Sequence, residues 1–190
     1  MKNQITLANG PELPCPYQGT TPPRDECVLR DLLQKQADIR PEAPFIRAMD
    51  GDQVSYAEFN RQVRNAAAAL QQLGVKQGDT VTVWLPNGTD MLRVWFAINW
   101  LGGIYVPINT AYKGGLLQHV LENAKSHLLV TCADLTPRLA GLELAELRTL
   151  VEFGDAGVSL PGVVRHDASE LLQAGEPIEP ERPIEPWDPQ

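Results

Sequence analysis

A chain of 190 residues is long enough for one ordinary domain or two small ones around a sizeable core. Hydrophobic residues make up 43% and charged residues 21%, which is ordinary globular usage and excludes wholesale disorder and fibrous repeats. The net charge of −8 opposes binding to phosphate backbones and anionic lipid surfaces, so we expect no nucleic-acid partner.

The composition also predicts where the chain resides. Residues 1–10 are polar and lack the apolar run of a secretory signal. The most apolar stretch, residues 91–101, is about half as long as a membrane-spanning helix needs to be. Cys15, Cys27 and Cys132 show no CxxC spacing, so neither a disulfide framework nor a metal site is expected. We therefore predict a cytoplasmic chain without a membrane span.

The chain begins with a segment that shows no periodicity. Residues 1–27 carry five prolines and predict an irregular amino-terminal arm. An α/β subdomain is expected over residues 28–175. It starts with a helix over 28–37, stopped by Pro41, and a hairpin of 45–48 and 54–56 around Asp50 and Gly51.

Two long helices and a strand are expected next. Ser55 and Glu58 have the spacing of a capping box, and an apolar stripe then runs over residues 59–73 to Gly74, which can close a helix. A β-rich run at 80–85 predicts a strand, and residues 90–101 follow as a helix that is apolar nearly all round.

Strands and helices continue to alternate in the second half. Short apolar runs predict strands at 104–108, 128–131 and 149–153, and helical patterns cover 116–124, a weaker segment near Thr136, and 168–173. This order favours an α/β fold with a mainly parallel sheet and helices on both faces.

Residues 176–190 differ in composition from the rest. Prolines recur at every third position between acidic residues, which predicts an acidic proline-rich connector rather than a helix. The alternative is a polyproline ligand that recruits a partner domain.

One loop is a candidate ligand-binding site. The strand at 104–108 leads into Asn109, Thr110, Tyr112, Lys113 and Gly114, after which a helix begins. Ligands favour the carboxyl ends of parallel strands, and free N–H groups at a helix start attract anions. The alternative is a plain strand-to-helix turn.

Four ordered segments resemble one superfamily, the adenylate-forming enzymes, which include acyl-CoA synthetases, luciferases and peptide-synthetase adenylation domains. Residues 54–59 resemble the motif Leu-Thr/Ser-Tyr-x-Glu-Leu, and residues 102–109 resemble Gly-Ala-x-x-Val-Pro-Leu-Asn/Asp. Between them, residues 73–79 and 85–87 are similar to the Leu-Gly-Val-x-x-Gly-Asp and Leu-Pro-Asn signatures. The resemblance covers roughly residues 28–190 and implies the amino-terminal subdomain of the acetyl-CoA synthetase-like, luciferase-like fold.

The resemblance implies a reaction and its cofactors. Relatives use ATP and Mg to convert a carboxylic acid into an acyl-adenylate, then pass the acyl group to coenzyme A. Their phosphate loop and catalytic residues lie downstream of the segments matched here. It follows that this chain alone holds no catalytic or metal-binding residue, binds no ATP and is inactive, and that its reading frame continues into the phosphate loop. In relatives the loop at Asn109, Thr110, Tyr112, Lys113 and Gly114 resembles part of the surface that receives the nucleotide end of coenzyme A.

The branch of the superfamily is indicated by a few positions. Asn109 after Pro107 and Ile108 is similar to acyl-CoA synthetases, in particular to crotonobetaine/carnitine-CoA ligases and the medium-chain ligases of fatty acid metabolism. Trp100 and Gly103 depart from the usual Lys and Ala, so the acyl substrate stays open. A piece of such an enzyme would expose apolar surface and could form a homodimer. The rival hypothesis is a free-standing α/β binding module with a partner-recruiting tail.

Overall fold

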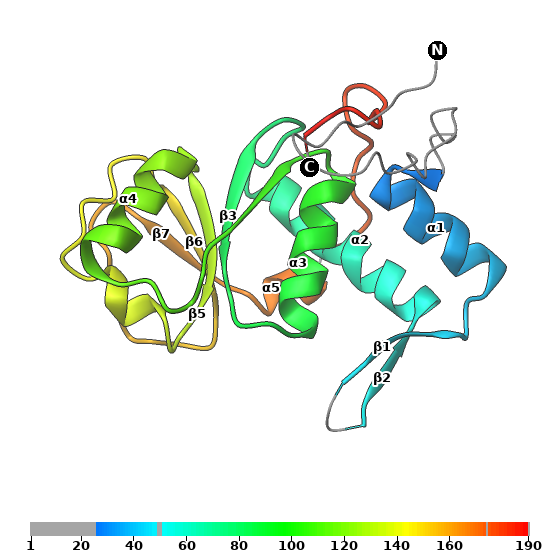
Figure 1. Ribbon diagram of the computed structural model, residues 1–190, viewed down its shortest axis with the longest axis horizontal. Coiled ribbons are helices and arrows are strands. Elements are labelled where there is room, and N and C mark those ends of the chain that lie inside the picture. The colour runs from blue at the N-terminus through cyan, green and yellow to red at the C-terminus, as the bar shows by residue number, and fades with distance from the viewer. Residues whose placement is uncertain (1–25, 49–50, 174, 190) are drawn as a thin grey trace, which may run out of the picture.

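The computed structural model describes residues 26–48, 51–173 and 175–189, so the arm predicted over 1–27 lies almost wholly outside the described residues. A central sheet is covered by helices on both faces (Figure 1). The helices are α1 (Leu29–Ile39), α2 (Tyr56–Gln72), α3 (Thr89–Trp100), α4 (Gly114–Ala124), the 3-10 helix η2 (Thr136–Leu139) and α5 (Glu170–Gln173). The strands are β1 (Pro44–Arg47), β2 (Gln53–Ser55), β3 (Thr80–Trp84), β4 (Ile104–Pro107), β5 (Leu128–Cys132), β6 (Thr149–Phe153) and β7 (Val164–Asp167).

The main sheet has five strands in the order β4-β3-β5-β6-β7, and every neighbouring pair is parallel. The strand order reverses between β3 and β5, because the chain passes from β3 out to β4 and then crosses back to β5 on the other side of β3. A parallel sheet needs crossover helices, which lie on its faces. The predicted α/β class with a parallel sheet is confirmed.

Successive side chains of each strand pack into two different cores. Val83 and Val130 face the core that contains Phe59 and Ile98, from α2 and α3. The intervening residues Trp84 and Leu129 face the opposite core, which α4 covers with Leu117. Because side chains alternate between the faces of a strand, both faces are apolar and both need helices, as predicted.

Helix α2 begins and ends where its sequence signals predict. The Ser55 hydroxyl accepts a hydrogen bond from the Glu58 N–H at 3.2 Å. The Glu58 carboxylate accepts from the side chains of Arg61 and Gln62, and the hydrogen bond to Arg61 is the largest cause that lowers the Glu58 pKa. Gly74 closes the helix with a φ of +94°, in the left-handed region that favours glycine.

The predicted hairpin is confirmed as the antiparallel pair β1–β2, while Asp50 of its turn lies outside the described residues. Phe45 fixes the hairpin to the helices behind it: its ring stacks on Phe59 with centroids 4.6 Å apart and meets the edge of Phe96 at 5.7 Å. The aromatic contacts join β1 to α2 and α3.

Strand β7 is the element that the sequence patterns do not predict. Its four residues, Val164 to Asp167, include three charged or titratable side chains, and Val164 is exposed. It lies at the edge of the sheet, where a strand contacts only one neighbour and needs little apolar character.

Helix α3 is apolar and mostly buried, as its sequence predicts. No helix in the described part of the chain is long and apolar enough to cross a membrane.

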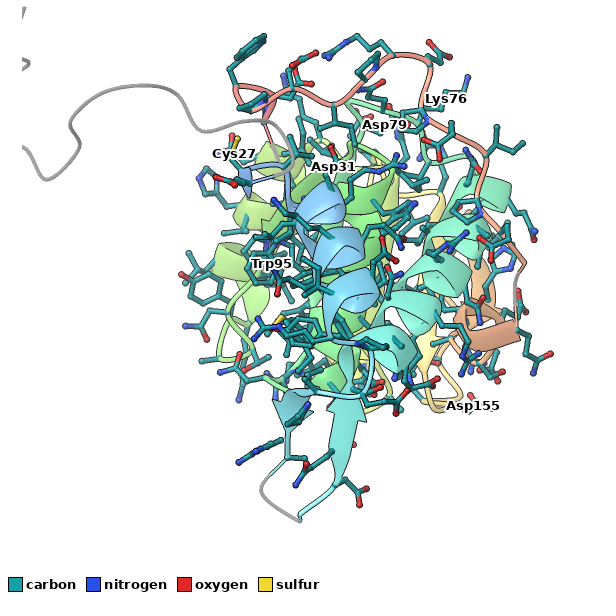
Figure 2. All side chains as sticks on the ribbon, turned by 90° about the vertical axis from the view of Figure 1, so that its right-hand side faces the viewer. Cys27, Asp31, Lys76, Asp79, Trp95 and Asp155 are labelled. Carbon is teal, nitrogen blue, oxygen red and sulfur yellow. The ribbon has the colours of Figure 1, made fainter. Side chains whose placement is uncertain are left out.

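The acidic proline-bearing residues 176–184, which we call the strap, cross one end of α1, α2 and α3 (Figure 1). The turn from Lys76 to Asp79, closed by a 2.9 Å hydrogen bond from the Lys76 N–H to the Asp79 carboxylate, lies at the same end (Figure 2). Ile184 of the strap is completely buried. The strap forms no helix, and its Ile184 packs into the domain.

Candidate functional site

The candidate loop follows β4 at the carboxyl edge of the sheet. The strand ends at Pro107, and Ile108 is buried and still donates to the Val83 carbonyl at 2.9 Å. The loop therefore leaves the sheet beside the end of β3, one strand away from the point between β3 and β5 where the order reverses. Such reversal points are where ligands collect in open parallel sheets.

Asn109 shapes the loop from within. Its side-chain oxygen accepts from the Ala111 N–H at 2.8 Å, and its carbonyl accepts from the Tyr112 N–H at 3.1 Å. A side-chain oxygen that bonds to the backbone two residues on stabilises a turn locally. The Asn109 side chain is thus engaged in folding the loop.

Two side chains from other elements hold the loop in place. The Trp84 indole donates to the Asn109 carbonyl at 3.1 Å, and Arg138 of η2 donates to the Thr110 carbonyl at 2.6 Å. The Arg138 guanidinium lies 5.9 Å from the centre of the Trp84 ring, within range of a cation–π contact. The loop is therefore positioned before any ligand arrives.

The end of the loop presents its backbone to solvent. Lys113 occupies the cap position of α4 with extended backbone, and Gly114 has a φ of +53°, in the left-handed region that favours glycine. Among the described residues, and apart from the chain neighbours and the backbone of α4 itself, no atom lies within 4 Å of where a Cβ on Gly114 or Gly115 would be. The first turn of α4 carries no acidic residue, so its free N–H groups and the exposed Lys113 favour an anion.

The five predicted site residues therefore fall into two groups. Asn109 and Thr110 use polar groups to build the loop, and Tyr112 packs against the core under α4. Lys113 and Gly114 are exposed and available to a ligand. The arrangement can bind a phosphate-bearing group, but it contains no paired nucleophile and base for bond breaking.

No cluster of three or more His, Cys, Asp or Glu side chains that could hold a metal occurs among the residues that the structure describes. A cavity of about 500 Å³ lies at the opposite end of β5, beside Ser126 and His127. The Ser126 hydroxyl there is engaged with the backbone of Thr80, Thr82 and Leu128, so it holds the turn together.

An ion pair between Glu152 of β6 and Arg165 of β7 joins these two strands. Glu152 is completely buried, and its carboxylate lies 2.7 Å from Nε of Arg165 and accepts from the Ala156 N–H at 3.3 Å. Arg165 also contacts the exposed Asp155 at 3.0 Å and donates to the Gly154 carbonyl. Its donors are engaged within the chain, so we assign it a structural role.

Comparison with known proteins assigns the chain to a family. The chain belongs to the AMP-binding enzymes, which match it over residues 33–189. This finding confirms the resemblance to the adenylate-forming superfamily and places both β4 and the loop inside the matched region.

Individual relatives have different names. The chain is 37% identical over 115 residues to enterobactin synthase component F of Escherichia coli O157:H7. The match covers 60% of this chain and 9% of that protein. It is 35% identical over 85 residues to the crotonobetaine/carnitine–CoA ligase of Salmonella paratyphi A, covering 45% of this chain and 16% of the ligase.

The fold is shared with solved structures. A long-chain-fatty-acid-CoA ligase from Archaeoglobus fulgidus superimposes with a TM-score of 0.71 at 22% identity, covering 85% of this chain and 33% of that one. The chain thus spans a small part of each curated relative and about a third of the solved enzyme.

Proposed function

We propose that the chain is the amino-terminal part of an ATP-dependent, AMP-forming acyl-CoA synthetase. Such an enzyme joins a carboxylic acid to AMP with Mg-ATP, releases pyrophosphate, and transfers the acyl group to the thiol of coenzyme A. The observation that carries this proposal is the family match over residues 33–189. Asn109, two residues after the end of β4, and the relatives named as CoA ligases support the acyl-CoA branch.

This chain holds none of the motifs that cradle phosphates, and its net charge of −8 repels a polyanion. We therefore propose that it is inactive by itself and that the residues acting on ATP lie elsewhere in the enzyme. The cytoplasmic location and a homodimer of this chain stay predictions.

The proposed activity is tested with the full-length product of the gene that encodes this chain. Purified protein is assayed for carboxylate-dependent exchange of pyrophosphate into ATP, and the product formed with coenzyme A is identified by mass spectrometry. The proposal requires exchange with at least one carboxylic acid and a coenzyme A thioester as product. Exchange without any thioester would place the chain in a different branch of the family.

In this enzyme we propose that the loop from Asn109 to Gly114 contacts the nucleotide end of coenzyme A. Thr110 and Tyr112 would shape this surface, while Lys113 would pair with a phosphate and Gly114 would let it approach the backbone. Lys113→Glu is expected to raise the Michaelis constant for coenzyme A about five- to thirtyfold, because it replaces attraction by repulsion at one exposed phosphate contact. The rate of pyrophosphate exchange is expected to stay unchanged, because that half-reaction does not involve coenzyme A.

Lys76→Glu is the matched control, since Lys76 is also exposed but precedes β3 at the opposite edge of the sheet. It should leave both measurements unchanged. An unaltered Michaelis constant for coenzyme A in Lys113→Glu would mean that the loop is a plain strand-to-helix turn without a role in binding. Equal losses in both half-reactions would indicate a disturbed fold.

A further inference from the structure

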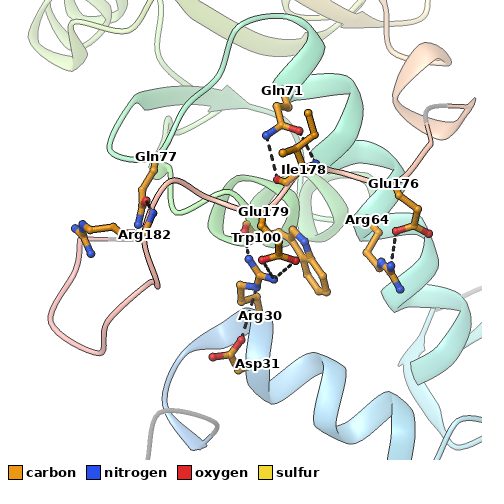
Figure 3. A network of polar contacts seen from close by, with 10 residues as sticks. All are labelled: Arg30, Asp31, Arg64, Gln71, Gln77, Trp100, Glu176, Ile178, Glu179 and Arg182. Carbon is orange, nitrogen blue, oxygen red and sulfur yellow. Dashed lines mark hydrogen bonds and ion pairs between the residues drawn. The ribbon is translucent and has the colours of Figure 1, made fainter.

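Two acidic residues of the strap are bound by arginines from two different helices (Figure 3). Glu179 accepts from Nη2 of Arg30 with both carboxylate oxygens, at 2.8 and 3.0 Å. Glu176 forms an ion pair with Arg64 of α2. The two carboxylates are three residues apart in the strap, so α1 and α2 each bind one of them.

The two arginines share a rigid support. The guanidinium of Arg30 lies 4.9 Å from the centre of the Trp100 ring, and that of Arg64 lies 5.9 Å from it. Arg30 also lies 3.4 Å from the Trp100 carbonyl and 3.6 Å from the Asp31 carboxylate, and its side chain is only 13% exposed. Because Trp100 is itself buried, these contacts hold both cations at fixed positions, ready for an anionic segment.

Two glutamines bind the backbone of the strap. The Gln71 side chain donates to the Ile178 carbonyl at 3.1 Å and accepts from the Ile178 N–H at 2.8 Å, while Gln77 accepts from the Arg182 N–H at 3.3 Å. The side chain of Ile178 is 76% exposed. The contact therefore recognises an extended backbone and sets its register without reading the side chain at that position.

An apolar anchor completes the interaction. Ile184 is completely buried beside Gly102, where a Cβ would lie 3.1 Å from the Ile184 side chain and 2.8 Å from that of Gln77. Gly102 has a φ of +70°, so glycine is required there both by the backbone and by the space.

We propose that Arg30, Arg64, Gln71, Gln77 and Trp100 form a binding groove for an extended acidic peptide, and that the strap is its intramolecular ligand. The ligand class is a segment with two carboxylates three residues apart and an aliphatic anchor five residues after the second. Every groove contact is made by a side chain of α1, α2, α3 or the turn before β3, so recognition does not depend on the covalent link to the strap. This groove is distinct from the coenzyme A loop and does not rest on the proposed function.

The first test measures whether the groove binds a separate peptide when the chain's own strap is not docked. In the full chain carrying Glu176→Gln, Glu179→Gln and Ile184→Ser, the strap loses both ion pairs and its buried apolar anchor, so the groove is open to an added peptide. A fluorescent synthetic peptide of residues 175–189 is then added and its anisotropy is measured. We expect saturable binding to this variant and at least about tenfold weaker binding to the unaltered chain, whose tethered strap competes at a high effective concentration.

Charge exchange tests the specificity of the groove. A peptide with Glu179→Arg should bind this open chain about tenfold more weakly than the natural peptide, and should recover its affinity when the open chain also carries Arg30→Glu. Arg47→Glu, on the exposed side of β1, is the control for the same change in net charge, and in the open chain it should leave the affinities for both peptides unchanged. Absence of peptide binding to the folded open variant, or equal effects of Arg30→Glu and Arg47→Glu, would overturn the proposal.

A second measurement needs no charge variant. Amide exchange of Ile178 in the unaltered chain should be slow, and Gln71→Ala, which removes its acceptor, should speed it about tenfold. Exchange of Ile178 at the rate of an unstructured peptide in the unaltered chain would contradict a docked strap.

Discussion

Replacing Trp84 by alanine is expected to lower the free energy of unfolding by about 3–5 kcal/mol, the largest effect of any single change proposed for this protein. Trp84 is completely buried at the centre of the core under α4, so its removal leaves a large cavity between the sheet and the helix. The substitution also removes the hydrogen bond to the Asn109 carbonyl. Urea unfolding followed by circular dichroism measures the loss.

Two other tryptophan variants separate the causes. Trp84→Phe keeps most of the ring but loses the hydrogen bond, and should cost about 1–2 kcal/mol. Trp187→Ala removes an equally large side chain that is 76% exposed, and should change stability by about 0.5 kcal/mol or less. Similar losses in Trp84→Ala and Trp187→Ala would contradict the assignment of Trp84 to the core.

Arg165→Met is expected to lower the free energy of unfolding by about 2–3 kcal/mol at neutral pH. Glu152 would then be left buried without its cation, and an unpaired buried carboxylate is costly. The expected loss of stability is smaller than for a fully buried ion pair, because the Arg165 side chain is 34% exposed. The Glu152 carboxylate also still accepts the hydrogen bond from the Ala156 N–H. Urea midpoints of the natural and altered chains give the difference.

The double variant with Glu152→Met and Arg165→Met should recover most of this stability, since two apolar side chains then replace the pair. Asp155→Asn alters only the exposed partner of Arg165 and should cost less than about 1 kcal/mol. A double variant as unstable as Arg165→Met alone would mean that packing around Arg165, and not its charge, determines the stability.

Most elements of the fold follow from local patterns in the sequence. Helix α2 has a cap at Ser55, an apolar stripe and a closing glycine at Gly74, and all three signals agree. The strands inside the sheet are mostly apolar and rich in β-branched residues, as burial on both faces favours. Strand β7 lacks both signals, because one neighbour and an exposed face impose no apolar pattern on Val164 to Asp167.

The candidate loop was predictable only in part. Its residues are contiguous, so the end of a strand and the start of a helix could be found together. The side chains that hold it, Trp84 and Arg138, come from positions 25 residues before Asn109 and 28 residues after Thr110. Only the strand order brings them together. In the same way, the spacing of prolines in the strap contains no information about Gln71 or Arg30.

The separation along the chain between the strap and its groove also sets an order of events during synthesis. Arg30 and Glu179 are 149 residues apart, so at a usual rate of about 5–20 residues per second a ribosome needs roughly 7–30 s to pass from one to the other. The arginines, Trp100 and both glutamines are all made well before residue 176. The residues of the groove are therefore synthesised several seconds before their ligand, and α1 gains its contact with Glu179 only after all five strands of the main sheet have been made.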